Sequence, residues 1–143
     1  MSLQNFQLPE NGIDSPGSSA MKPVTVVVAV ADSVTNQSLT SSLRSHFRVV
    51  LPLPGVDEVR TTVLKHRADV IVADLESMSA GDLAAVLKDF PSLSAVCVHR
   101  LADDRLWSAA LAAGALDCCH PSDIRGIVMA VNREGRLAQG HAA

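Results

Sequence analysis

The sequence predicts an α/β fold built on a doubly wound, five-stranded parallel sheet with helices on both faces. Apolar runs rich in β-branched residues alternate five times with segments of helical periodicity. Strict alternation of this kind implies parallel strands joined by right-handed crossovers. The first run, 24–30, consists mostly of valine, which is typical of a strand buried on both faces.

The first two strand–helix pairs are predicted between Val24 and His66. The strand 24–30 is followed by a helix over 33–47, which Asp32 or Ser33 can cap. The apolar stripe of this helix is expected to contain Val34, Leu39, Leu43 and Phe47. The next strand, 48–53, ends among prolines, which cannot continue a ladder. A second helix is predicted over 56–66, with an inner side formed by Val56, Val59, Val63 and Leu64.

The remaining elements follow the same alternation. Strands are predicted over 68–74, 94–99 and 116–119. Helices are predicted over 81–90, over 103–113 and from Ser122 or Asp123, either of which can cap, to about Leu137. Gly114 is expected to stop the second of these helices.

One domain over residues 23–138 is expected from a length of 143 residues. Residues 1–22 are rich in Ser, Gly, Pro, Asn and Gln and cannot bury enough apolar surface to offset their ordering entropy. They are predicted to form a flexible N-terminal arm, and residues 139–143 a flexible C-terminal tail. The chain is expected to be either a stand-alone domain or a piece of a longer protein with an output domain.

Composition excludes several classes of function. A net charge of -3, with 12 basic and 15 acidic residues, gives no general nucleic-acid surface. No apolar run reaches the ~18 residues of a membrane span, and no signal peptide opens the chain, so a cytoplasmic location without membrane contact is expected. Cys97, Cys118 and Cys119 lie in apolar segments and are predicted to be buried, reduced thiols.

Three common binding and catalytic motifs are missing from the sequence. The segment 30–35 after the first strand contains no glycine, which argues against a dinucleotide or P-loop phosphate site. The chain also lacks the G-x-S-x-G elbow of α/β hydrolases. Dehydrogenase, nucleotide-binding and hydrolase functions are therefore disfavoured.

Polar residues collect where the predicted strands end, namely Asp32, Asp74, His99, Arg100 and His120. The carboxyl ends of parallel strands meet at one edge, where ligands bind. Carboxylates there favour a hard divalent cation, and a strand-end carboxylate can attack a phosphoryl group. Asp32, Asp74, His99 and His120 could alternatively form a transition-metal site. Asp32 could also be a plain helix cap, and both histidines ordinary loop residues.

Several segments resemble the receiver domains of two-component response regulators. Residues 68–75 (ADVIVADL) resemble the strand that carries the phosphoacceptor aspartate, and Gly81 stands where many receivers have a glycine. Residues 91–99 resemble the strand that leads to the switch Thr or Ser. Residues 112–117 (AAGALD) resemble the family's A-x-G-A-x-D turn, and Pro121 resembles the proline after the family's conserved lysine.

The resemblance covers residues 23–138 and carries expectations about fold and site. It implies a flavodoxin-like strand order, 2-1-3-4-5. It makes Asp74 the phosphoacceptor and implies Mg²⁺ bound by Asp32 and Asp74. His99 and His120 are then expected to contact the phosphoryl group, because they stand at the switch Thr or Ser and the lysine positions.

The sequence departs from the family at several of these positions. The family's paired acids after the first strand are reduced to Asp32, so Mg²⁺ is expected to bind weakly or not at all. His99 and His120 replace a hydroxyl and a lysine, and an imidazole donates only in the right tautomer or when charged. These departures are those of an atypical receiver.

Three functions remain open. The first is a receiver that takes a phosphoryl group from a sensor histidine kinase on Asp74, with no enzymatic activity beyond its own phosphorylation and dephosphorylation. The second is a phosphorylation-independent pseudo-receiver that binds a signalling protein or dimerises. The third is a small-molecule sensor that uses the same crevice, which predicts a sizeable cavity above the strand ends.

The predicted interaction face consists of the fourth helix, the fifth strand and the fifth helix. Trp107 and Leu111 are expected to form its apolar patch, although Trp107 could instead be a packing residue. This face is where a homodimer or a partner protein would bind, as the resemblance implies. Its charged rim would consist of Arg100, Arg105, Arg125 and Arg133.

Overall fold

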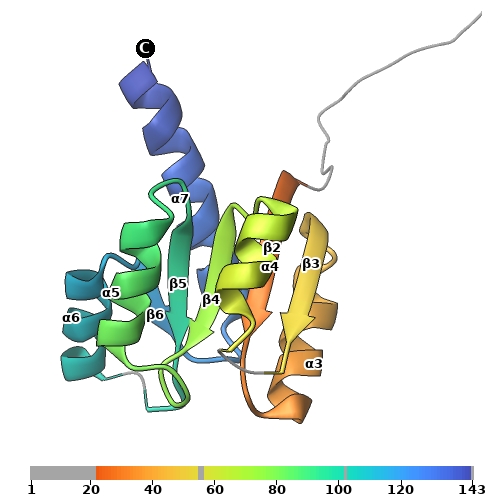
Figure 1. Cartoon of the computed structure of the whole chain (residues 1–143), viewed down its shortest axis with the longest axis vertical. Helices are drawn as coiled ribbons and strands as arrows, with labels where there is room; N and C mark the ends of the chain where they lie inside the picture. The colour runs from red at the N-terminus through yellow and green to blue at the C-terminus, as the bar shows by residue number, and fades with distance from the viewer. Residues whose placement is uncertain (1–21, 55–56, 102, 143) are drawn as a thin grey trace, which may run out of the picture.

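The computed structural model describes residues 22–54, 57–101 and 103–142 (Figure 1). Its strands are β2 (Lys22–Ala29), β3 (Phe47–Leu53), β4 (Val70–Asp74), β5 (Ser94–Val98) and β6 (Asp117–Cys119). Its helices are α3 (Ser33–Leu43), α4 (Val59–His66), α5 (Ala80–Asp89), α6 (Asp104–Ala113) and α7 (Ile124–Ala142). All strand pairs are parallel, in the order β3-β2-β4-β5-β6. The predicted fold class and strand order are confirmed.

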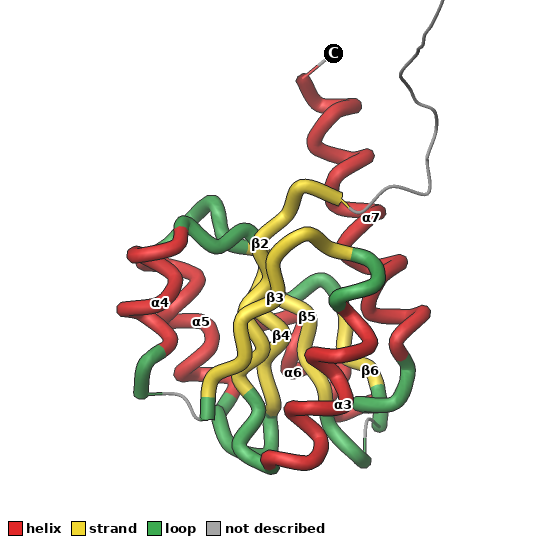
Figure 2. The backbone as a smooth tube through the Cα atoms, turned by 90° about the vertical axis from the view of Figure 1, so that its right-hand side faces the viewer, coloured by secondary structure: helices red, strands yellow, loops and turns green. Residues whose placement is uncertain are grey.

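Two hydrophobic clusters cover the two faces of the sheet. Helices α4, α5 and α6 pack on one face, and helices α3 and α7 pack on the other (Figure 2). Successive residues of β2 point alternately into the two clusters, so that Val27 belongs to one and Val26 and Val28 to the other. All three are fully buried. This burial on both faces explains why the strand is a nearly continuous run of valine.

The helix predicted over 33–47 is shorter than expected. It ends at Leu43, and Phe47 is the first residue of β3. Val34, which was predicted to face the core, is 73% exposed. The buried positions are 36, 39, 40 and 43, which follow the i, i+3, i+4, i+7 spacing of one helix face. Leu39 and Leu43 are confirmed as part of the buried stripe. The placement of Val34 in it was wrong, because the other two buried positions are polar.

Asn36 is the buried polar residue that the apolar pattern concealed. Its Nδ2 donates to the backbone oxygens of Val30 at 2.9 Å and Leu53 at 2.8 Å, and more weakly to that of Val28 at 3.3 Å. Its Oδ1 accepts a hydrogen bond from Thr40 Oγ1 at 3.1 Å. Asn36 therefore ties α3 to the carboxyl ends of β2 and β3.

One predicted core residue and two predicted boundaries also differ from the structure. Leu64 of α4 is 72% exposed, whereas Val59 and Val63, one turn apart, are buried. Strand β2 begins at Lys22, the last residue of the predicted arm. Residues 1–21 of that arm and Val56 of the predicted second helix lie outside the described residues. Helix α7 continues past Leu137 into the segment predicted as a tail, since no proline stops it.

Several local predictions are confirmed. Gly114 ends α6 in the left-handed region at φ 108°, where residues with a side chain are strained. Asp123 Oδ1 accepts from Gly126 N at 3.0 Å and so caps α7. The three cysteines are free and buried, and burial raises the pKa of Cys97 and of Cys119 to about 12. Within the described ranges, no helix combines the length and apolarity needed to cross a bilayer.

Candidate functional site

A pocket of about 270 Å³ lies at the carboxyl ends of β2, β4 and β5. Strand β4 pairs with both β2 and β5, so the residues that follow these three strands meet at one edge of the sheet. The polar side chains that line the pocket are Asp32, Thr35, Asp74, Glu76, Ser77 and Arg100. The predicted crevice is present, with a different set of polar residues from the one expected.

Asp74 is the last residue of the central strand β4 and is only 6% exposed. Its Oδ1 accepts a hydrogen bond from Glu76 N at 2.8 Å, and its Oδ2 has a long contact of 3.4 Å with Ser77 Oγ. The backbone oxygen of Asp74 accepts from Ser77 N and Met78 N. The chain thus turns tightly around Asp74, and this turn fixes one carboxylate oxygen and leaves the other more weakly held.

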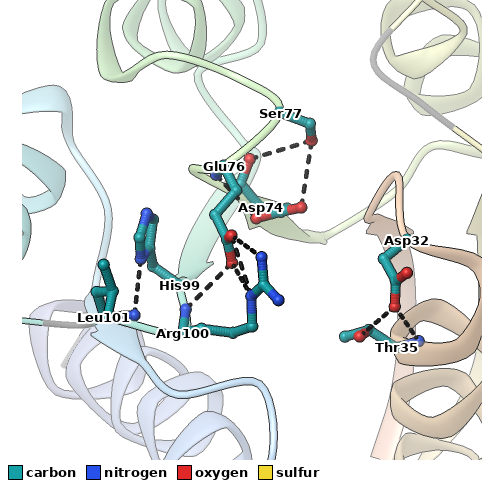
Figure 3. A network of polar contacts seen from close by, with 8 residues as sticks. All are labelled: Asp32, Thr35, Asp74, Glu76, Ser77, His99, Arg100 and Leu101. Atoms are coloured by element: carbon teal, nitrogen blue, oxygen red, sulfur yellow. Dashed lines mark hydrogen bonds and ion pairs between the residues drawn. The ribbon is translucent and has the colours of Figure 1, made fainter.

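Glu76 and Arg100 form an ion pair on the wall of this pocket (Figure 3). Arg100 Nη2 lies 2.6 Å from Glu76 Oε1, and Arg100 Nε lies 3.0 Å from Glu76 Oε2. The backbone N–H of Arg100 also donates to Oε2 at 3.2 Å. Such a bidentate guanidinium–carboxylate contact is among the strongest ion-pair geometries in proteins. These hydrogen bonds lower the pKa of Glu76 to about 2.

We expect Glu76 to titrate near pH 2 in the protein and close to its ordinary value of 4.5 in Arg100→Gln. A carboxylate whose pKa is lower in the folded state than in the unfolded state stabilises the fold at pH values above the unfolded-state pKa. This contribution is lost as the pH falls through the folded-state pKa. The ion pair should therefore persist at pH 4 and break only near pH 2. Carboxyl carbon NMR over an acid titration measures both values, and a Glu76 pKa near 4.5 in the unmodified protein would contradict the pairing.

Asp32 is the N-cap of α3. Its Oδ2 accepts from Thr35 Oγ1 at 2.6 Å and from Thr35 N at 2.9 Å. These hydrogen bonds lower the pKa of the Asp32 carboxyl, with a smaller contribution from the charge of Arg100. The capping alternative that the sequence left open is present, and the same side chain lines the pocket.

The carboxylates of Asp32, Asp74 and Glu76 supply the oxygen ligands that Mg²⁺ prefers. Even so, no group of three or more His, Cys, Asp or Glu side chains is placed to hold a metal ion in the described part of the chain. Asp32 is engaged by Thr35, and Glu76 by Arg100. As arranged, the residues do not fit a divalent cation, and the four-residue transition-metal alternative is not formed. Mg²⁺ at Asp32 and Asp74 stays a prediction, and binding there would require Asp32 to give up its contacts with Thr35.

The two predicted histidines lie differently from what a phosphoryl contact needs. His99 Nδ1 accepts from Leu101 N at 2.9 Å, and Figure 3 shows its ring turned away from Asp74. His120 Nδ1 is engaged by Ser122, at 3.1 Å from the backbone N and 2.8 Å from Oγ. His120 lines a neighbouring pocket, which shares Arg100 with the first. Phosphoryl contacts by either histidine stay predictions.

Sequence reasoning missed the ion pair beside Asp74. Glu76 was not singled out, and Arg100 was named only as a strand-end and rim residue. A signal was present, because an acid two residues after one strand end and a base just after the next strand carry opposite charges to the same edge. The backbone N–H of Leu75 donates to Val98 O at 3.0 Å, which brings the two strand ends together.

The predicted interaction face has an exposed apolar part. Trp107 is 46% exposed and Leu111 36% exposed. Trp107 Nε1 donates to Asp117 Oδ1 at 3.0 Å, and Arg133 reaches Asp117 Oδ2 at 3.4 Å. Trp107 is therefore held by a hydrogen bond, while its ring stays partly open to solvent. The binding of a partner or a second copy at this face stays a prediction.

No family model and no curated protein matches this chain. Among solved structures, a response regulator from Thermotoga maritima matches with a TM-score of 0.67 and 20% identity, over 79% of this chain and 97% of that chain. A response regulator protein from Burkholderia pseudomallei, solved with a phosphorylated aspartic acid, a calcium ion and citrate, matches with a TM-score of 0.67 and 18% identity, over 84% of this chain and 73% of that one.

A third match is the CheX-CheY-BeF3-Mg+2 complex from Borrelia burgdorferi, with a TM-score of 0.66 and 16% identity, over 77% of this chain and 87% of that chain. Identities this low establish the fold alone. The chain thus has the fold of response-regulator receiver domains, as the resemblance implied.

Proposed function

We propose that this chain is a receiver domain in which Asp74 accepts a phosphoryl group from a phosphorylated histidine of a sensor kinase. The observation that carries the proposal is the carboxylate of Asp74, which is nearly buried at the end of the central strand and lines the pocket at the strand ends. The matched Burkholderia protein has a phosphorylated aspartic acid, and the matched Borrelia complex contains BeF3 and magnesium. Both structures support phosphoryl chemistry on this fold.

The chemistry requires little beyond positioning. An oxygen of Asp74 forms a bond to phosphorus, the bond from phosphorus to the donor nitrogen breaks, and the histidine leaves with the electron pair and takes up a proton. Glu76 N holds Asp74 Oδ1, which leaves the more weakly held Oδ2 as the attacking atom. The product is an acyl phosphate that water later hydrolyses. The domain acts only on itself and has no metabolic substrate.

Acetyl phosphate tests this function without knowledge of the kinase. The protein is incubated with acetyl phosphate and Mg²⁺, and intact mass and Trp107 fluorescence are followed. We expect a gain of one phosphoryl mass, which Asp74→Asn abolishes because its amide is not a nucleophile. Asp104→Ala, an exposed acid at the start of α6, serves as the matched control and should be labelled like the unmodified protein. Labelling that persists in Asp74→Asn would exclude Asp74 as the acceptor.

A second function, a phosphorylation-independent interaction module, is favoured by one observation. The charges that would attract a metal ion are already committed, Glu76 to Arg100 and Asp32 to Thr35. This function predicts no labelling of the folded protein at any Mg²⁺ concentration. It also predicts binding of a protein or of a second copy at the face that contains Trp107 and Leu111. Sedimentation of the unmodified protein and of Trp107→Ala over a range of concentrations measures the self-association.

The small-molecule sensor is the least supported of the three functions. The pocket of about 270 Å³ is smaller than the roughly 300 Å³ at which ligand pockets usually begin. Its polar lining consists mainly of charged side chains, of which Glu76 and Arg100 form an ion pair. Such a site disfavours an apolar ligand.

A further inference from the structure

Arg100 is the only cationic side chain among the described residues that line the pocket. It faces the carboxylates of Asp32, Asp74 and Glu76 there, and Figure 3 shows its guanidinium on the same side of Glu76 as Asp74. In the described part of the chain, Glu76 alone forms hydrogen bonds with it. The negative charges of Asp32 and Asp74 also raise the pKa of Arg100, after the larger effect of Glu76. The site therefore contains a fixed positive charge of its own.

We propose that Arg100 leaves Glu76 and binds the phosphoryl group at Asp74, so that Asp74 is phosphorylated without a divalent cation. This inference rests on the proposed function and names the residue that stabilises the charge. An attacking carboxylate and a phosphoryl group are both anionic, so a cation must lie beside them in the transition state. The arrangement of Asp32 and Glu76 does not provide a metal site, whereas Arg100 is already in place.

The exchange replaces one set of charge-assisted hydrogen bonds by another. The Arg100 side chain is 71% exposed, so solvent can hydrate its guanidinium while it leaves Glu76, and the hydrogen bonds to the phosphoryl group offset the loss of those to Glu76. Once released, the Glu76 carboxylate can be hydrated at the rim of the pocket. Arg100 lies two residues beyond the end of β5 at Val98, and a change of side-chain rotamers turns its guanidinium from Glu76 toward Asp74.

The phosphoryl group is a better partner for Arg100 than Glu76 is. A phosphorylated residue carries between one and two negative charges and offers three strong acceptor oxygens. The guanidinium matches such a group through two parallel hydrogen bonds. The same added charge repels the ionised carboxylate of Glu76, so the phosphoryl group both attracts Arg100 and weakens its present contact.

The test uses acetyl phosphate in two buffers, one with EDTA and one with Mg²⁺. In the reaction an Asp74 oxygen bonds to phosphorus, the bond from phosphorus to the acetyl oxygen breaks, and acetate leaves with the electron pair. The variants are Arg100→Gln, Glu76→Gln and, as the matched control, Arg105→Gln on the exposed surface of α6. Circular dichroism checks that each variant is folded.

In EDTA we expect labelling of the unmodified protein and of Arg105→Gln at similar rates. Arg100→Gln should be slower by on the order of tenfold to a hundredfold, the value of a charge-assisted hydrogen-bonded contact. Glu76→Gln should be labelled faster than the unmodified protein, because its Arg100 is free and one repelling charge is gone. A merely structural role of the ion pair would instead slow both variants.

Three other outcomes of this experiment would each overturn a proposal. Labelling of the unmodified protein with Mg²⁺ but not with EDTA would overturn the inference and leave Asp74 as the phosphoacceptor. Equal rates for Arg100→Gln and the unmodified protein in EDTA would also overturn it. No labelling in either buffer would overturn the proposed function itself, and this inference with it. The Arg100 Nε–H resonance adds a direct readout, since it should shift when beryllium fluoride is added and stay unchanged in Asp74→Asn.

Discussion

Replacing Phe47 by alanine is expected to lower the free energy of unfolding by about 4 kcal/mol, within the usual range for truncating a buried phenylalanine. Phe47 is 1% exposed and belongs to the cluster between the sheet and helices α3 and α7, together with Leu39, Leu43 and Ile127. Few aromatic residues are present in this chain, so no neighbour of similar size can fill the cavity. The loss combines the lost transfer free energy with the cost of the cavity.

Urea denaturation followed by circular dichroism measures the change in Phe47→Ala. Phe47→Leu is the matched control and should cost only about 1 kcal/mol, because it keeps most of the buried volume. If Phe47→Ala is too unstable to fold, the leucine variant still gives a measurable midpoint. Two variants with the same stability as the unmodified protein would show that Phe47 is not in the core.

The second large effect is expected from Asn36→Ala, which should destabilise the protein by about 3 kcal/mol, because buried carbonyl oxygens lose their donor. Alanine cannot donate to the backbone oxygens of Val30 and Leu53, and Thr40 loses its acceptor. Alanine is a better helix former than asparagine, so the loss must come from these tertiary hydrogen bonds. Val30 also lines the pocket, and its strand end should become more mobile.

Gln37→Ala is the control for Asn36→Ala. It alters the next residue of the same helix, which is exposed, and should change the stability by no more than about 0.5 kcal/mol. Asn36→Asp keeps the shape but removes both N–H donors and buries a charge, so it should cost at least as much as alanine. Amide hydrogen exchange at the ends of β2 and β3 reports the local effect. Equal stabilities for Asn36→Ala and Gln37→Ala would contradict the role of Asn36.

The fold followed from features that depend on local sequence. A run of valine is unfavourable on a surface and suits a strand buried on both faces, and β2 is such a strand. Glycine at a positive φ ends a helix wherever it occurs, as Gly114 does for α6. Five alternations of this kind leave few topologies, so the strand order could be predicted through the resemblance and is confirmed.

The errors concern residues whose environment is set by distant parts of the chain. Phe47 is apolar, which is compatible with the end of a helix or the start of a strand. It belongs to the strand because it pairs with Lys22 of β2. Asn36 is polar, so the sequence alone indicates an exposed residue. In the folded chain two strand ends lie beside it and accept its hydrogen bonds. Val34 and Leu64 are apolar but lie off the buried faces of their helices, and no periodicity of so short a segment distinguishes them.

By itself, the sequence determined that five parallel strands end at one edge and that Asp74 stands at the end of the third strand along the chain, because hydrophobic patterning and chain order are local properties. Only the tertiary structure decided that Arg100, and not the adjacent His99, lines the pocket and pairs with Glu76. Neighbouring residues at a strand end point in different directions. Which of them meets Asp74 depends on how two strands, far apart in the chain, lie side by side.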